Sequence, residues 1–193
     1  MEAIATAGCY KFAIAGSALT GHVPEAIINL LPSARFAKFE NFLGGEKQGI
    51  DFKLFDYQDD GNKKYTVLAF NVQQTRALSP CFIVRPPHKY DSLKTLFSDF
   101  ILLPGILPTE YTLLALKSEQ VAVRQVMRAI SIYKWPQLDL FAEITMCNGE
   151  WLLFYKPERL LSAEQESVER FLEIGADMAS AVLYANREHY HHW

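Results

Sequence analysis

The chain has 193 residues, of which 50% are hydrophobic and 21% are charged, and its formal net charge is −3. This amount of apolar material suffices for one core of ordinary size, so we expect a single domain over residues 1–188 and a histidine-rich tail over residues 189–193. The composition offers no excess of Lys or Arg to neutralise phosphates, which speaks against nucleic acid as a partner.

The three cysteines, Cys9, Cys81 and Cys147, lie far apart in the sequence. Because they are odd in number and widely spaced, they match neither a disulfide framework nor a zinc site of paired thiolates, and we interpret them as reduced core residues. The N-terminal stretch lacks the pattern of a cleavable leader, and no stretch supplies the roughly 20 apolar residues that a membrane-spanning helix needs. These features predict a cytoplasmic chain.

A short first helix is predicted from Pro24 to Leu31, because proline is favoured just inside the start of a helix and Pro32 ends the run. Apolar residues then continue at helical spacing up to a pair of glycines, and we call their phenylalanines the aromatic ridge. The aromatic ridge consists of Phe36, Phe39 and Phe42, followed by Leu43. We expect it to pack into the core beside the first strand, and the alternative is that it forms a binding surface.

Three runs that alternate with a period of two predict strands over Ile50–Phe55, Tyr65–Val72 and Cys81–Val84. Residues 59–62 read Asp-Asp-Gly-Asn and separate the first two runs as a turn. We predict an antiparallel meander. Since the second and third runs carry apolar residues on both faces, both sides of the sheet should be covered, one by helices and the other by chain or by a partner.

The stretch Phe100–Pro108 is apolar, but Pro104 and Gly105 interrupt it. It is too short and too broken to span a membrane. We consider it the second candidate binding surface, with Ile101 and Leu102 at its centre. A protein, a lipid or a second copy of the chain is the kind of partner that such a surface contacts.

Ser118 is the predicted N-cap of a second helix, with Glu119 in its first turn. The helix is predicted to end at Trp135, which precedes a proline. Its apolar residues recur at intervals of three and four, which predicts one buried and one solvated face. They are Ala122, Val123, Val126, Met127, Ile130 and Tyr133.

Two further alternating runs, Leu140–Met146 and Trp151–Tyr155, are joined through Asn148-Gly149. Asn-Gly supplies the two positive-φ residues that a tight hairpin turn needs, so we predict a C-terminal hairpin. A capping box of Ser162 and Gln165 follows and predicts the start of another helix.

This final helix is long, and its apolar stripe predicts packing against the sheet. The stripe consists of Val168, Phe171, Leu172, Gly175, Met178, Ala179 and Val182. Gly175 in the middle of the stripe predicts a close approach of the helix to the sheet. The predicted fold class is therefore α+β: a largely antiparallel sheet, made of the meander and the hairpin, packed by helices.

Sheet and turn residues also carry a resemblance to a known family. They run in order through Gly45–Tyr57, Tyr65–Val67, Leu78–Pro80, Phe82, Val84–Pro86 and Trp151–Pro157. This series resembles an uncharacterised bacterial domain family over about residues 40–185. Domains of that family often follow predicted N-terminal membrane helices, and no activity, cofactor or catalytic residue is established for them. The resemblance therefore implies a fold, with membrane association only through a partner or through a segment outside this sequence.

Imidazoles spaced like those of His189, His191 and His192 are able to bind a transition metal. No carboxylate or thiolate is fixed beside them, so we interpret these histidines as a polar tail and expect no metal site. The stretch Gly44–Lys47 lacks the long glycine loop and the Lys-Ser/Thr pair of a phosphate-binding loop. We accordingly expect no cofactor.

The acidic residues give weaker signals. Asp56, Asp59 and Asp60 stand near a strand end without the register of a calcium loop, and we interpret them as turn residues. Glu143 lies within an apolar strand, where an inward position would require a partner such as an arginine, and we expect it to face solvent.

Two functional classes remain. The favoured one is a noncatalytic binding or scaffold domain that contacts a protein partner, or forms a homo-oligomer, through the aromatic ridge or through Ile101 and Leu102. The alternative is an enzyme, or a protein that binds a small molecule or lipid, with an unrecognised pocket. The candidate chemical groups of that alternative are Glu143, Asp56 and Tyr57.

Overall fold

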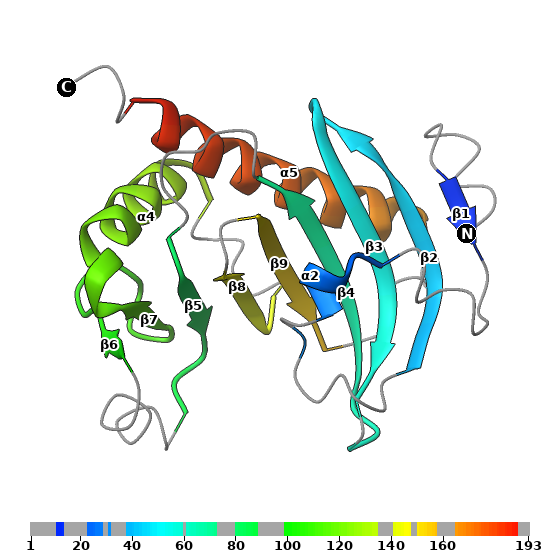
Figure 1. The fold of residues 1–193 in the computed structure, drawn as a ribbon, viewed down its shortest axis with the longest axis horizontal. Helices are drawn as coiled ribbons and strands as arrows, with labels where there is room; N and C mark the ends of the chain where they lie inside the picture. The colour runs from blue at the N-terminus through cyan, green and yellow to red at the C-terminus, as the bar shows by residue number, and fades with distance from the viewer. Residues whose placement is uncertain are drawn as a thin grey trace.

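A computed structural model describes residues 11–13, 23–28, 31, 38–59, 61–72, 80–88, 99–134, 141–147, 150–157 and 165–188. Its strands form one antiparallel sheet, and two longer helices pack on one face of that sheet (Figure 1). The predicted α+β fold, with its long C-terminal helix, is therefore confirmed. No described helix is long and apolar enough to cross a membrane.

The described elements follow the predicted series with some differences. The strands are β1 (Lys11–Ala13), β2 (Lys38–Lys47), β3 (Ile50–Gln58), β4 (Lys64–Asn71), β5 (Phe82–Arg85), β6 (Phe100–Leu102), β7 (Thr112–Leu116), β8 (Glu143–Cys147) and β9 (Trp151–Lys156). The helices are α2 (Glu25–Ile28), the 3-10 turn η3 (Lys117–Glu119), α4 (Gln120–Lys134) and α5 (Gln165–Glu188). The second and final predicted helices are confirmed by α4 and α5, whereas α2 is shorter than the predicted first helix.

The sheet runs in the order β1-β2-β3-β4-β9-β8-β5-β7-β6, and its neighbouring strands are antiparallel. Strands β2, β3 and β4 form an antiparallel meander, which differs from the predicted one through β3, β4 and β5. Strands β8 and β9 form the predicted hairpin, whose Asn148-Gly149 turn lies outside the described residues. The third predicted run, β5, is not the neighbour of β4, because this hairpin lies between them. Strands β6 and β7, which the alternation did not predict, extend the sheet beyond β5.

Phe39, Phe42 and Leu43 lie in strand β2, so the helical spacing predicted for this part of the aromatic ridge is wrong. A β-bulge explains the interval of three residues: the register against β3 shifts between Glu40 and Leu43, and Asn41 has a φ of 53°. Asparagine tolerates this left-handed conformation better than most residues. The extra residue brings Phe39 and Phe42 to the same face of the sheet, whereas a regular strand would place them on opposite faces.

A two-residue turn joins β2 to β3, and Gln48 and the glycine after it both have positive φ, 53° and 77°. Side chains at this turn contact α5. Lys47 Nζ lies 3.5 Å from Glu169 Oε2, and Gln48 Nε2 donates a hydrogen bond to Asp177 Oδ1 at 2.7 Å. Ser180 Oγ donates to Gln48 Oε1 at 3.1 Å. We call these polar contacts the hairpin clasp.

The main core fills the space between the sheet and helices α4 and α5. Its aromatic rings pack closely: the ring centroid of Phe141 lies 5.0 Å from that of Phe154 and 5.3 Å from that of Phe171. The predicted apolar stripe of α5 is buried in this core. Gly175 makes the predicted close approach, because a Cβ at this position would lie 2.6 Å from Leu68 Cδ2 and 2.9 Å from Phe70 Cε2.

A second core covers the opposite face of the central strands, where α2 lies across the sheet from α5 (Figure 1). Ile27 of α2 is fully buried there with Phe55 of β3 and Leu153 of β9. Neighbouring residues in a strand point to opposite faces, so β3, β4 and β9 are buried on both sides. This confirms the predicted covering of both faces for β4, with long helices on one face and another chain segment on the other, whereas Ile83 of β5 is only half-buried.

The start of α4 differs from the prediction. Ser118 lies inside the turn η3, and the helix begins at Gln120, so Ser118 is not its N-cap. The neighbouring Glu119 has a long-range role instead, because its Oε2 accepts a hydrogen bond from the backbone N–H of Cys81. This contact ties the start of α4 to the beginning of β5.

The close approach at Gly175 predicts a stability cost for any larger residue. We expect Gly175→Val to lower the free energy of unfolding by about 1–3 kcal/mol, because the added atoms overlap with buried Leu68 and Phe70. Arg170→Val, at an exposed position of the same helix, should change it by less than about 0.5 kcal/mol. Urea unfolding followed by circular dichroism measures both, and equal stability of the two variants would contradict the close approach.

Candidate functional site

Strand β6 is the last described strand at one end of the sheet, and we call Phe100–Leu102 together with its outer edge the β6 end. The Leu103 N–H donates a hydrogen bond to Leu113 O at 2.9 Å, so the backbone groups of position 103 point toward β7. Adjacent positions of an antiparallel strand bond to opposite sides. The N–H and C=O of Leu102 therefore face the outer edge, along which no described strand pairs.

The predicted apolar loop Phe100–Pro108 is a strand followed by a turn, in which Gly105 has a φ of 76°. Leu102 is 48% exposed, which is high for a leucine. Ile101 lies on the other face, where it is half-buried and packs against the main core. The two residues at the centre of this predicted surface thus differ: Leu102 lies on the surface, and Ile101 supports the core.

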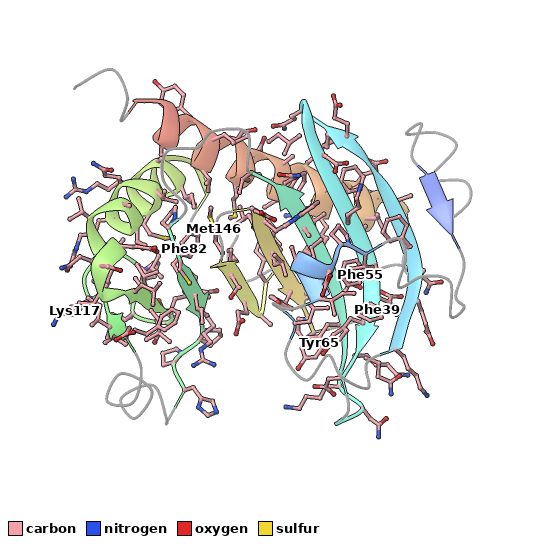
Figure 2. The ribbon with its side chains drawn as sticks, viewed as in Figure 1. Phe39, Phe55, Tyr65, Phe82, Lys117 and Met146 are labelled. Atoms are coloured by element: carbon pink, nitrogen blue, oxygen red, sulfur yellow. The ribbon has the colours of Figure 1, made fainter. Side chains whose placement is uncertain are left out.

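The other candidate surface, that of the aromatic ridge, lies around Phe39. The Phe39 ring centroid is 5.7 Å from those of Phe55 and Tyr57, and the Tyr57 centroid is 6.2 Å from that of Tyr65. We call these four residues the aromatic group, and Figure 2 shows three of them beside α2. Phe55 and Tyr57 are buried, whereas Phe39 and Tyr65 are half-buried and form its accessible margin.

The predicted packing of the aromatic ridge into the core is confirmed for Phe42. It is 6% exposed, and a Cβ on Gly44 would come within 3.0 Å of its Cε1 atom. Phe36 lies outside the described residues. The aromatic group and the β6 end do not form one site, because seven strand spacings, roughly 34 Å, separate β2 from β6. In Figure 2, Phe39 and Lys117, which directly follows β7, lie toward opposite ends of the sheet.

Tyr65 is the titratable member of the aromatic group, and sequence periodicity did not single it out. Burial is the main cause that raises the pKa of its phenol above the ordinary value of 10.0, and the negative charges of Asp59 and Glu143 raise it further. Glu143 is half-buried on the same face and accepts a hydrogen bond from Thr145 Oγ1 at 3.1 Å. The phenol is consequently neutral over the physiological range and able to donate a hydrogen bond.

Asp56 is a buried strand residue, so its interpretation as a turn residue is wrong. Its Oδ2 accepts a hydrogen bond from Asn41 Nδ2 and its Oδ1 accepts one from Thr66 Oγ1, both at 2.8 Å. Because Asn41 is the bulge residue of β2, the carboxylate holds the bulge against β3 and β4. This network therefore positions Phe39 and Phe42, which flank the bulge.

The three candidate groups of the enzyme alternative do not converge. Asp56 lies on the α5 face of β3, in alternation with Leu54, while Tyr57 lies on the α2 face and is 1% exposed. Glu143 lies on the α2 face of β8, opposite Tyr155 in the register. The backbone of the sheet separates Asp56 from the other two, so these three side chains cannot act on one bound substrate.

Asp59 has the turn role predicted for it. Its carbonyl oxygen accepts a hydrogen bond from the Asn62 N–H at 3.1 Å, and its Oδ1 accepts one from the Lys63 N–H at 2.8 Å. Asp60 and the tail over residues 189–193 lie outside the described residues. Among the residues that the structure describes, no group of three or more His, Cys, Asp or Glu side chains is arranged to hold a metal ion.

Comparison with known proteins places the chain in a structural class. No protein-family model matches the chain, and no curated protein matches it in sequence. Its α+β fold does occur in a solved structure, the crystal structure of the mycobacterial trehalose monomycolate transport factor A, TtfA. The two share 12% identity with a TM-score of 0.60, over 94% of this chain and 91% of that one. At this identity the similarity shows a shared fold alone.

The buried network predicts a large effect of removing its carboxylate. We expect Asp56→Ala to lower the free energy of unfolding by about 2–4 kcal/mol, because Asn41 and Thr66 each lose a buried acceptor. Asp51→Ala on the same strand is the control: it removes a surface ion pair to Lys53 at 3.0 Å and should cost less than about 1 kcal/mol. Chemical unfolding of both variants tests this, and equal costs would argue against a structural role for Asp56.

The raised pKa of Tyr65 predicts a titration above pH 10.0. The difference between the ultraviolet phenolate signals of the wild type and of Tyr65→Phe reports the titration of Tyr65 alone. Glu143→Gln should lower the midpoint of this titration, because it removes a negative charge. The pKa of Tyr65 is higher in the folded chain than in the unfolded chain. The contribution of its neutral phenol to the free energy of unfolding is therefore fully present below the unfolded pKa and is lost as pH rises through the folded pKa. A midpoint at or below pH 10.0 would disprove the assigned environment.

Proposed function

We propose that this chain is a noncatalytic binding domain and that the β6 end is the surface through which it associates with a protein. The observation that carries the proposal is Leu102, a leucine 48% exposed on an edge strand whose outward N–H and C=O pair with no described strand. Sheet edges that avoid association carry lysine, proline or inward-pointing charge. The stretch Phe100–Leu102 has none of these.

A second copy of the chain fits this edge geometrically. Positions 100 and 102 direct their backbone groups outward and lie symmetrically about Ile101. A two-fold axis through Ile101 would therefore set Phe100 of one copy opposite Leu102 of the other in an antiparallel arrangement. The same pairing covers the exposed Leu102 with an aromatic side chain. An edge strand of another protein would bind by the same addition to the sheet.

The similar fold of TtfA supports a binding role in a second way, because that protein is named as a transport factor, and transport requires a protein that binds cargo or other components. The resemblance to a bacterial family whose domains often follow membrane helices would place such a partner at a membrane. In our proposal the domain is cytoplasmic, and any membrane association comes through the partner or through a segment outside this sequence.

Lipid binding is the second candidate function. It is favoured by the structural neighbour TtfA, whose name gives trehalose monomycolate as what that protein helps to transport. The half-buried margin of the aromatic group, formed by Phe39 and Tyr65, is the described surface that would suit an apolar ligand with a hydroxylated head.

Sedimentation velocity and native mass spectrometry of the purified chain test both functions together. We expect a reversible dimer that Leu102→Asp weakens at least about tenfold, because pairing would bury the introduced charge. Leu102→Pro should do the same, since it removes only the outward N–H of an edge strand. Val121→Asp is the control, because Val121 is 65% exposed on α4.

The unfolding transition separates binding from folding. Leu102→Asp should leave it nearly unchanged, whereas Ile101→Asp should destabilise the chain because Ile101 packs on the main core. A chain that stays monomeric up to roughly 100 µM would exclude a second copy as the partner. An added mass that is lost on denaturation would favour the lipid function instead.

A further inference from the structure

Two cysteines that are 66 positions apart in the sequence occupy neighbouring positions in the sheet. The register of β5 against β8 pairs Phe82 with Met146, and both residues are labelled in Figure 2. One further step along this antiparallel ladder places Cys81 opposite Cys147. Strand β8 continues through Cys147, which pairs with Trp151 of β9.

Both positions lie on the face of the sheet away from α5. Phe82 and Met146 belong to the main core on the α5 face. Because successive strand positions alternate between faces, positions 81 and 147 share the other face with Ile83 and Thr145. The cysteine positions therefore face each other across the ladder on the same side of the sheet.

The hydrogen-bond pattern fixes the type of this pair. The Leu116 N–H donates to Cys81 O at 3.3 Å, and the Cys81 N–H donates to Glu119, so the backbone of position 81 bonds toward β7. Its pair with β8 is then a non-hydrogen-bonded pair, in which opposing Cα atoms are about 4.5 Å apart. A disulfide bridges Cα atoms that are about 4.4–6.8 Å apart, so this separation is suitable.

We propose that Cys81 and Cys147 form a redox-sensitive thiol pair that is oxidised to a disulfide across β5 and β8. The Cys81 side chain is a buried thiol in this structure, 8% exposed. The oxidant belongs to the class of low-molecular-weight disulfides. One cysteine thiolate attacks the small disulfide and releases one small thiol; the second thiolate attacks the mixed disulfide, releases the other small thiol and forms the Sγ–Sγ bond.

The atoms and electrons of this exchange balance. The two cysteine thiols lose two protons and two electrons in total, and the small disulfide takes them up as it becomes two thiols. In a reducing compartment the pair stays as thiols and is oxidised when the small-thiol pool is oxidised. The resulting bond would close a loop that contains β5, β6, β7, α4 and β8, and so would fasten the β6 end to the rest of the sheet.

The test treats the folded full chain with oxidised glutathione, alkylates the remaining thiols and measures the intact mass and the cross-linked peptides. We expect a loss of about 2 Da, one alkylated cysteine, and a peptide pair that joins Cys81 to Cys147. We also expect a rise of roughly 5–10 °C in the unfolding midpoint, reversed by dithiothreitol. Chain oxidised while unfolded in urea is the reference, because its three cysteines pair without structural preference.

Variants assign the bond. Cys9→Ser should keep the mass loss and the stabilisation, whereas Cys81→Ser and Cys147→Ser should each abolish both. If a buried serine at position 81 prevents folding, Cys81→Ala replaces it, and the peptide map of the wild type does not depend on either variant. Persistence of three alkylated cysteines in the folded chain, or a bond that involves Cys9 or a second chain, would overturn the proposal.

Discussion

Burial of the central strands on both faces is the constraint on which the rest of the structure depends. In most half-buried sheets the alternation of apolar and polar residues fixes the register, because a slip by one residue would expose the apolar set. Strands β3, β4 and β9 are apolar on both faces, so hydrophobic burial alone distinguishes registers poorly. Specific local contacts must fix the register instead. The structure supplies them at the two ends of β3, as a turn with two positive-φ residues and as the buried carboxylate of Asp56.

The sequence predicted those parts of the fold that depend on local periodicity. The alternating runs of β3, β4, β8 and β9 and the apolar stripes of α4 and α5 each belong to one continuous segment, so they can be read from neighbouring residues. The position of β5 beyond the hairpin depends on contacts between segments far apart in the chain, which periodicity does not report. The bulge at Asn41 misled the prediction for β2, because one added residue gives a strand the three-residue interval of a helix.

The candidate site shows the same division. Residue type drew attention to Ile101 and Leu102, but only the strand position shows that one supports the core and the other lies on the surface. Asp56 resembled the turn acids that follow it, because burial of a carboxylate depends on donors from Asn41 and Thr66, which stand elsewhere in the sequence. Tyr65 carried no signal of its own, since the rise in its pKa comes first from burial and then from the negative charges of Asp59 and Glu143.

The hairpin clasp has a consequence for helix α5. An apolar helix on an apolar sheet buries nearly the same area when it slides along its axis by one turn, about 5.4 Å. Glu169 and Ser180, the outermost partners of the clasp on α5, are 11 residues apart, and both contacts originate from adjacent residues at one strand turn. A slide by one turn would leave Lys47 a carboxylate partner, because Glu173 Oε1 lies 3.8 Å from its Nζ. It would still break the Ser180 contact and would move Gly175 off Leu68, replacing it with a residue that has a side chain. A few polar atoms and one missing methyl group thus select a single axial position from several that bury almost equal apolar area.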